Sequence, residues 1–204
     1  MSGFVYRDAG GLAQAARWAL YADSLVCAAA VAIALVQGPW ALLYGEFAGP
    51  FAAVQLLTTL AGLILFLIWF YRANANVRAM GADGLMGSPG LSVAWFFIPI
   101  LWFFMPFVVM RDTWKASASP RDWQGQSTDP LLGFWWAFML MAGIAGSISF
   151  RLWLMDDFDL IEAIGIFDLI ANGGAIVANL LSVAVLQRIQ RLQVSPAHLS
   201  EHFR

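Results

Sequence analysis

Five polar or small residues repeat at helical spacing in the last apolar stretch of the sequence. They are Asp168, Asn172, Ala175, Asn179 and Ser182. At 100° per residue, an α-helix gathers them within an arc of about 80°. On insertion scales, an acid at the centre of a membrane helix costs up to about 2.5–3.5 kcal/mol of free energy, so a polar stripe in a span needs a structural or functional explanation. The stripe either stabilises helix packing through interhelical hydrogen bonds, or forms a polar path or binding site for a proton, a cation or a small solute.

Two charged residues in other apolar stretches extend this candidate intramembrane site. Arg151 ends the preceding stretch, and its long side chain could reach inward to pair with Asp168. Asp23 lies about one and a half turns into the first stretch and could reach the headgroups or pair with Arg17, although a spacing of six residues is poor for a same-face pair. The candidate site therefore consists of Asp168, Asn172, Asn179, Arg151 and Asp23, with Asp168 the residue most expected to act.

Catalytic and metal-binding motifs offer little support for an enzyme. The run from His198 to His202 fits the zinc signature H-x-x-E-H, but no third ligand follows before Arg204, so we expect a solvated tail. A Ser-His-Asp set, a Walker loop and a Rossmann glycine pattern are all absent from the sequence. We therefore expect no catalytic residues, no cofactor and no bound metal.

The composition places the chain among integral membrane proteins. Hydrophobic residues make up 61% of its 204 residues and charged residues 12%, whereas globular proteins have about 45–50% and 25%. Eleven basic and thirteen acidic residues, bunched between apolar runs, are too few to cover a water-soluble surface. The net charge of −2 gives no reason to expect a nucleic-acid partner.

Four apolar stretches are long enough to cross a bilayer, whose hydrocarbon core of about 30 Å requires about 20 helical residues. They are Trp18–Gln37, Pro50–Tyr71, Leu131–Phe150 and Ala163–Leu186. A fifth stretch, Leu91–Met110, is also long enough but contains Pro99 and Pro106. Each proline removes a backbone donor and clashes with the preceding turn, so a straight fifth span is disfavoured.

The basic residues decide between four and five spans, because Lys and Arg accumulate on the cytoplasmic side of a membrane. If Leu91–Met110 crosses and the N-terminus is inside, five basic residues lie inside and six outside. If this stretch enters and leaves from the same face, ten lie inside and Arg151 alone lies outside. The second distribution is typical of a real topology, so we predict four spans with both termini cytoplasmic.

The proline-containing segment 89–117 is then expected to enter the membrane without crossing it. Ser88 and Pro89 suit a helix start, Pro99–Met105 suits a break, and a second helix would return toward the headgroups. A re-entrant hairpin and an aromatic helix lying flat in the interface both remain open. The fold class is thus all-α, with residues 1–204 forming a single membrane domain and residues 187–204 a cytoplasmic tail.

Several runs in the middle of the chain form a recognisable pattern. They are YRANANVRAMGADGL (Tyr71–Leu85), SPG (Ser88–Gly90), WFFIPI (Trp95–Ile100) and MPFVVMRDTWKAS (Met105–Ser117). Together they resemble a bacterial membrane family named domain of unknown function 4328. The resemblance implies a bacterial multi-spanning protein and no particular activity. Members often carry Asn a few residues after the first proline, where this chain has Trp102.

These observations favour a noncatalytic accessory or interaction protein of the bacterial inner membrane. Its expected partners are membrane lipids and the helices of other membrane proteins, and the same surfaces could join copies of this chain. The alternative is a small transporter or channel subunit that uses Asp168, Asn172 and Asn179 on the last span.

Overall fold

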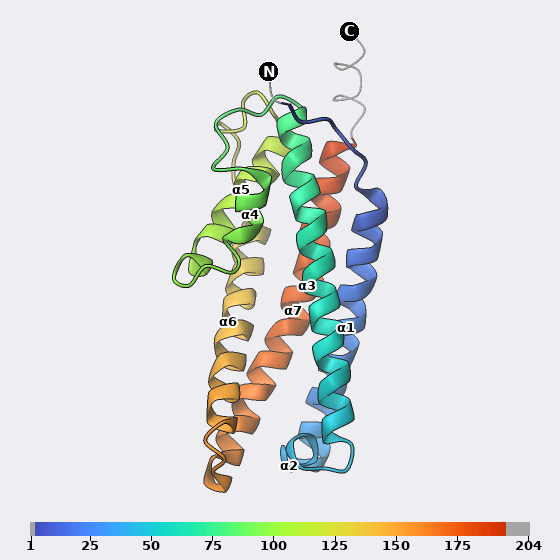
Figure 1. The fold of residues 1–204 in the computed structure, drawn as a ribbon, viewed down its shortest axis with the longest axis vertical. Coiled ribbons are helices and arrows are strands. Elements are labelled where there is room, and N and C mark those ends of the chain that lie inside the picture. Colours follow the sequence, from blue (N-terminus) through green and yellow to red (C-terminus); the bar gives the residue numbers. More distant parts are fainter. Residues whose placement is uncertain (1–2, 195–204) are drawn as a thin grey trace. The chain divides into compact units, whose positions relative to one another are not determined.

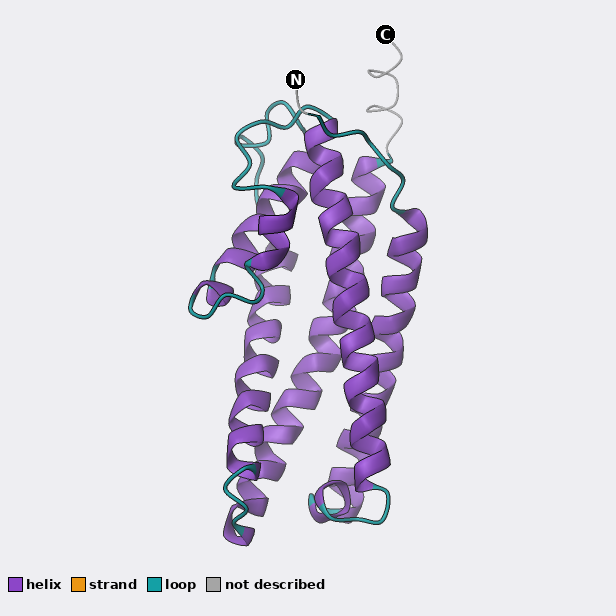
Figure 2. Cartoon of the chain, in the orientation of Figure 1, coloured by secondary structure: helices purple, strands orange, loops and turns teal. Residues whose placement is uncertain are grey.

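The computed structural model describes residues 3–194 and consists of helices joined by short connections (Figures 1 and 2). The long helices are α1 (Gly10–Gln37), α3 (Ala48–Ala79), α6 (Pro130–Trp153) and α7 (Ile161–Gln193). The short helices are α2 (Trp40–Leu43), α4 (Pro89–Ala94), η1 (Leu101–Phe103), α5 (Met105–Ala118) and η2 (Phe158–Leu160). No strand occurs in residues 3–194, which confirms the all-α prediction.

Four helical stretches are long and apolar enough to span a membrane. They are α1, α3, α6 and the stretch Phe158–Gln193 that combines η2 with α7. The shortest, α6, has 24 residues, which rise about 36 Å and exceed the hydrocarbon core. Only 17–33% of the most apolar window of each stretch is buried in the protein. Outward-facing apolar surface of this kind suits helices surrounded by lipid, so the four-span prediction is confirmed.

The predicted cytoplasmic tail, residues 187–204, begins inside α7, which continues to Gln193. Gln193 is almost fully buried, so the helix is held by packing beyond the predicted span. The remainder of that tail, including the His198–His202 motif and Arg204, lies outside the described residues.

The segment between α3 and α6 is broken where the prolines predict a break. α4 begins with Ser88, whose hydroxyl accepts a hydrogen bond from the Leu91 amide, and Pro89 occupies the first turn. The chain then turns between Trp95 and Phe104, and α5 begins at Met105. α4 and α5 contact each other, as Figure 1 shows in green. Whether this segment enters the bilayer as a hairpin or lies in its interface stays a prediction.

Contacts between residues divide the chain into two compact units. The first comprises residues 1–17, 64–133 and 183–204, and the second comprises residues 18–63 and 134–182. Each of the four long helices therefore contributes residues to both units.

The first unit has a core of large apolar side chains. Trp69, Phe70, Val77, Met110 and Ile189 are fully buried in it. α3 ends here at a glycine: Gly81 has a φ of +95°, and the Ala82 amide donates back to the Val77 carbonyl over 3.0 Å. This geometry closes the last helical turn in the manner of a Schellman motif and leads into the connection before α4.

The second unit packs its helices through small residues. A side chain added at Gly174 of α7 would place its Cβ 3.3 Å from the Cβ of Ala142 and 2.9 Å from Met141 Cε, both in α6. A Cβ at Gly146 of α6 would lie 3.8 Å from that of Ala171. Small residues allow the backbones of membrane helices to approach closely, and they leave room for polar contacts between helices.

Candidate functional site

Asp23 of α1 is the centre of a hydrogen-bond cluster in the second unit. Its side chain is almost fully buried, with 4% of the residue surface exposed. One carboxylate oxygen accepts hydrogen bonds from Thr59 Oγ1 at 2.7 Å and from Thr58 Oγ1 at 3.1 Å, both on α3. The other oxygen accepts from Asn179 Nδ2 on α7 at 2.8 Å. A single carboxylate thus joins three helices through neutral donors.

A second branch of hydrogen bonds leads to Asp168. Gln55 Nε2 of α3 donates to Asn172 Oδ1 over 2.6 Å, and Asn172 Nδ2 donates to the backbone carbonyl of Asp168 over 2.8 Å. The Asp168 carboxylate accepts a hydrogen bond from the Ser149 hydroxyl of α6. Gln55 also meets the first branch, because its backbone carbonyl lies 3.0 Å from Thr58 Oγ1.

These two branches form what we call the intramembrane polar network. It consists of Asp23, Gln55, Thr58, Thr59, Ser149, Asp168, Asn172 and Asn179. Ser182, the last residue of the predicted stripe, accepts a separate hydrogen bond from the indole nitrogen of Trp135 over 2.8 Å. The network therefore includes both predicted intramembrane acids and the two amides between them.

Arg151 does not join this network. It is exposed near the end of α6, and its predicted ion pair with Asp168 is not formed. Ser149, which does bind Asp168, precedes Arg151 by two positions, so the two side chains leave the helix about 200° apart. Within the second unit, the oxygens of Asp23 accept hydrogen bonds from hydroxyl and amide donors.

Sequence reasoning missed the contribution of α3 and of Ser149. Gln55, Thr58 and Thr59 are spaced at i, i+3 and i+4, which places them on one helix face. This spacing of polar residues in the otherwise apolar helix α3 could have been used to predict a second polar helix face.

The network can provide interhelical adhesion, and its carboxylate, hydroxyl and amide oxygens are also the groups that bind protons or hard cations. Hydroxyl and amide groups donate to both carboxylates: Thr58, Thr59 and Asn179 to Asp23, and Ser149 to Asp168. Within residues 3–194, no cluster of three or more His, Cys, Asp or Glu residues could hold a metal ion.

The first unit contains a different arrangement, which we call the amide clamp. Asn76 Oδ1 accepts from the Arg7 amide at 3.0 Å, and Asn76 Nδ2 donates to the Arg7 carbonyl over 2.9 Å. Gln193 Oε1 lies 3.4 Å from the same Nδ2. Gln193 Nε2 in turn donates to the Ala73 carbonyl and to Ser117 Oγ, each over 3.0 Å. The clamp fastens the N-terminal segment, α3, α5 and α7 at one point.

A neighbouring pair extends the hydrogen bonding between α3 and α5. Asn74 Nδ2 donates to Thr113 Oγ1 over 2.9 Å, and Asn74 Oδ1 accepts from Arg78 Nε at 3.2 Å. Asn74 and Asn76 both belong to the run YRANANVRAM, while Thr113 and Ser117 belong to MPFVVMRDTWKAS. The two runs therefore meet in space and join α3 to α5.

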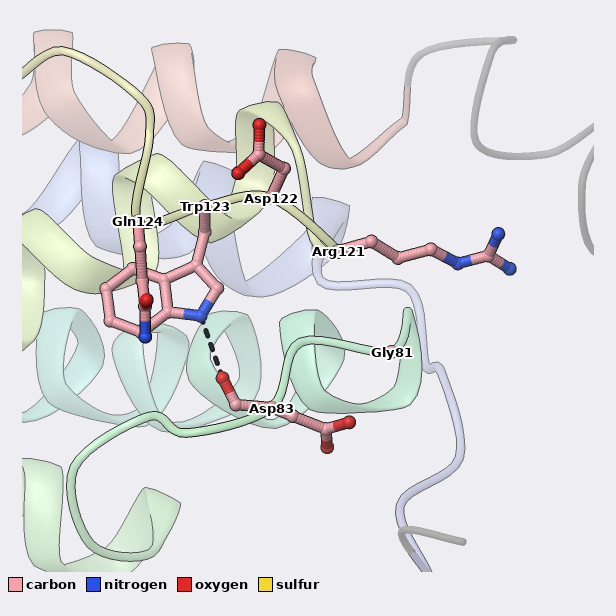
Figure 3. A pocket seen from close by; sticks show the side chains of 6 residues that line it. All are labelled: Gly81, Asp83, Arg121, Asp122, Trp123 and Gln124. Carbon is pink, nitrogen blue, oxygen red and sulfur yellow. Dashed lines mark hydrogen bonds between the residues drawn. The ribbon is translucent and has the colours of Figure 1, made fainter.

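A pocket of about 400 Å³ lies beside the end of α3 (Figure 3). Its lining consists of Gly81, Asp83, Arg121, Asp122, Trp123 and Gln124. The Trp123 indole nitrogen donates to the Asp83 carbonyl over 2.8 Å, while the Arg121 and Asp83 side chains extend away from the indole ring. Trp123 also packs on a buried apolar cluster that includes Val77. We call this site the mixed-charge pocket, because it combines one cation with two acids.

Four membrane-length helices with outward apolar surfaces and inward polar contacts define a multi-pass α-helical membrane protein. The sequence profile of the family described as Domain of unknown function (DUF4328) matches residues 45–191, and the chain belongs to that family. This match confirms the resemblance carried by the middle of the chain. No curated protein and no solved structure matches the chain.

The range matched by the family profile contains most, but not all, residues of the intramembrane polar network and of the amide clamp. It includes α3 to α6 and most of α7, with Asn76 and all network residues except Asp23. Asp23 and Arg7 precede it. The network thus joins residues of the matched range to one residue outside it, Asp23, and the amide clamp joins them to two, Arg7 and Gln193.

Proposed function

We propose that this chain is a noncatalytic accessory or interaction protein of the bacterial cytoplasmic membrane. The observation that supports this most directly is the engagement of the last-span stripe by other helices. Asn172 binds Gln55, Asn179 binds Asp23 and Ser182 binds Trp135. Hydrogen bonds of this type hold membrane helices together, each contributing about 0.6 kcal/mol on average.

The outward surface is the part available to partners. Leu56, Leu57 and Leu60 of α3 are between 41% and 67% exposed, so this helix presents apolar side chains in the second unit. Lipid acyl chains, the helix of another membrane protein or a second copy of this chain would each suit such a face.

The proposed orientation has both termini in the cytoplasm. It rests on the ten-to-one distribution of basic residues under the four-span arrangement. A reporter fused after Trp123 should read cytoplasmic, and one fused at Asp156, between α6 and η2, should read external. An external reading after Trp123 would contradict the orientation.

Reconstitution of the purified chain into liposomes tests the accessory role. We expect the flux of protons, of Na⁺ and of K⁺ to equal that of protein-free liposomes. An ion flux that depends on the protein would overturn the proposal.

A small transporter or channel subunit is the second candidate, and one observation favours it. Asp23 and Asp168 belong to one network inside apolar helices, and an acid inside a membrane helix is costly if helix packing is its sole role. On this hypothesis Asp168→Asn should change the flux or its pH dependence while leaving the fold intact. Ser147→Ala, which removes a hydroxyl bonded only within α6, is the matched control.

A further inference from the structure

A second pocket in the first unit has a basic lining. Its volume is about 230 Å³, and it is formed by the N-terminal segment together with one turn of α3. Its lining consists of Gly3, Phe4, Val5, Arg7, Tyr71, Arg72 and Ala75. This lining contains two guanidinium groups and no carboxylate, and we call it the basic pocket.

The amide clamp holds the backbone of Arg7 at this pocket. Asn76 accepts a hydrogen bond from the Arg7 amide and donates one to the Arg7 carbonyl, and Asn76 itself is only 1% exposed. Arg72 precedes Asn76 by four residues on α3, so the two side chains lie on the same face of the helix. The buried clamp therefore fixes the backbone from which Arg7 reaches the pocket that Arg72 also lines.

No acidic group of the described chain neutralises this pair. Neither Arg7 nor Arg72 forms an ion pair within residues 3–194. The nearest acid in sequence, Asp8, accepts a hydrogen bond from the Gly10 amide at 3.1 Å and so faces the start of α1. Burial, and to a smaller extent the Asp8 carboxylate, raise the pKa of the Tyr6 phenol, which therefore stays neutral. Two like charges at one site favour a bound anion.

The place of the pocket on α3 indicates the source of the anion. Tyr71 ends the predicted second span, so Tyr71 and Arg72 lie where a membrane helix reaches the headgroups. Phe4 and Val5 are 39% and 74% exposed beside the arginines. Exposed apolar side chains next to cationic ones are typical of a surface that contacts lipid.

We propose that the basic pocket binds the phosphate of an anionic lipid headgroup. Arg7 and Arg72 pair with the phosphate oxygens, and the Tyr71 hydroxyl is a further donor in the lining. Phe4 and Val5 lie against the apolar part of the same lipid. The mixed-charge pocket is a poorer site for this ligand, because Asp83 and Asp122 would repel a phosphate. This binding is independent of whether the chain is an accessory protein or a transporter.

The test measures thermal unfolding of the full chain in a neutral detergent while lipid is added. Phosphatidylglycerol should raise the unfolding temperature in a saturable manner, because a ligand that binds the folded state stabilises it. Phosphatidylcholine, which carries no net charge, should not. The apparent affinity for phosphatidylglycerol should fall about tenfold in Arg7→Gln and about tenfold in Arg72→Gln.

Arg121→Gln is the matched control, because it removes one exposed arginine from the mixed-charge pocket. It should keep the affinity of the unmodified chain. An equal loss in Arg121→Gln would show general charge attraction and overturn the site. Arg7→Lys and Arg72→Lys keep the charge and test the same site if a glutamine variant folds poorly.

Inorganic phosphate separates the lipid from a free anion. It should cause little stabilisation at concentrations where phosphatidylglycerol saturates the shift, because it lacks the apolar part. Equal stabilisation by inorganic phosphate would assign the pocket to a free anion, and equal stabilisation by phosphatidylcholine, whose phosphate is balanced by a choline cation, would overturn the preference for an anionic lipid.

Discussion

The amide clamp and the intramembrane polar network both bury polar side chains, but they hold different kinds of structure. The clamp uses uncharged amides to bind the backbone of Arg7, which lies before the first turn of α1. The network uses two carboxylates, Asp23 and Asp168, to bind side chains that project from regular helices. The unit that contains the clamp has a core of large apolar side chains, whereas the unit that contains the network packs α6 against α7 through small residues.

This difference separates polar groups that the fold requires from those that it does not. A nonhelical segment cannot pair its own backbone groups, so the Arg7 amide and carbonyl need partners when they are buried. Helices satisfy their own backbones inside a bilayer, so the carboxylates of the network fill no such need. Replacing the clamp should therefore damage stability more than replacing the network.

Asn76→Ala should have the largest effect on stability. It removes both hydrogen bonds to Arg7 and the contact with Gln193, and it leaves their polar atoms unpaired at a cost of about 3 kcal/mol. Unfolding of the chain in mixed micelles with increasing denaturant measures this loss. Gln126→Ala, which removes one exposed hydrogen bond, should change stability by less than about 0.5 kcal/mol. Similar losses in both variants would remove the distinction that defines the clamp.

Asp23→Asn should have an intermediate effect of about 1 kcal/mol. The amide keeps one oxygen acceptor for the threonines but places an NH₂ group near Asn179, which loses a hydrogen bond. Removal of the charge offsets part of this loss, because a carboxyl group is costly to insert into a membrane helix. The same unfolding measurement applies. A loss as large as that of Asn76→Ala would mean that the carboxylate is required for folding.

Ser149→Ala should have the smallest effect, about 0.6 kcal/mol, because it deletes one interhelical hydrogen bond to Asp168. Ser147→Ala is its control, since the Ser147 hydroxyl binds the Gly143 carbonyl of its own helix over 2.7 Å. Unfolding of the two variants side by side distinguishes interhelical bonding from bonding within a helix. No difference between them would indicate that Asp168 gains nothing from Ser149.

The sequence determined the class of the protein and its four spans. It also located the break between Pro99 and Met105 and the acids Asp23 and Asp168 inside apolar stretches. These features depend on the length of an apolar run, the missing amide of proline and the cost of a charge in lipid. Each acts locally along the chain, so composition and spacing are sufficient to find it.

Only the tertiary structure decided which polar residues meet. Asp23 pairs with Asn179 across 156 positions, and Arg7 meets Asn76 across 69. Asp168 accepts a hydrogen bond from Ser149 and does not pair with the oppositely charged Arg151. The rotation of α6 points the Ser149 side chain toward α7 and the Arg151 side chain away from it. Helix rotation and packing set these contacts, and the hydrophobic pattern of a span that is apolar on nearly every side does not encode its rotation.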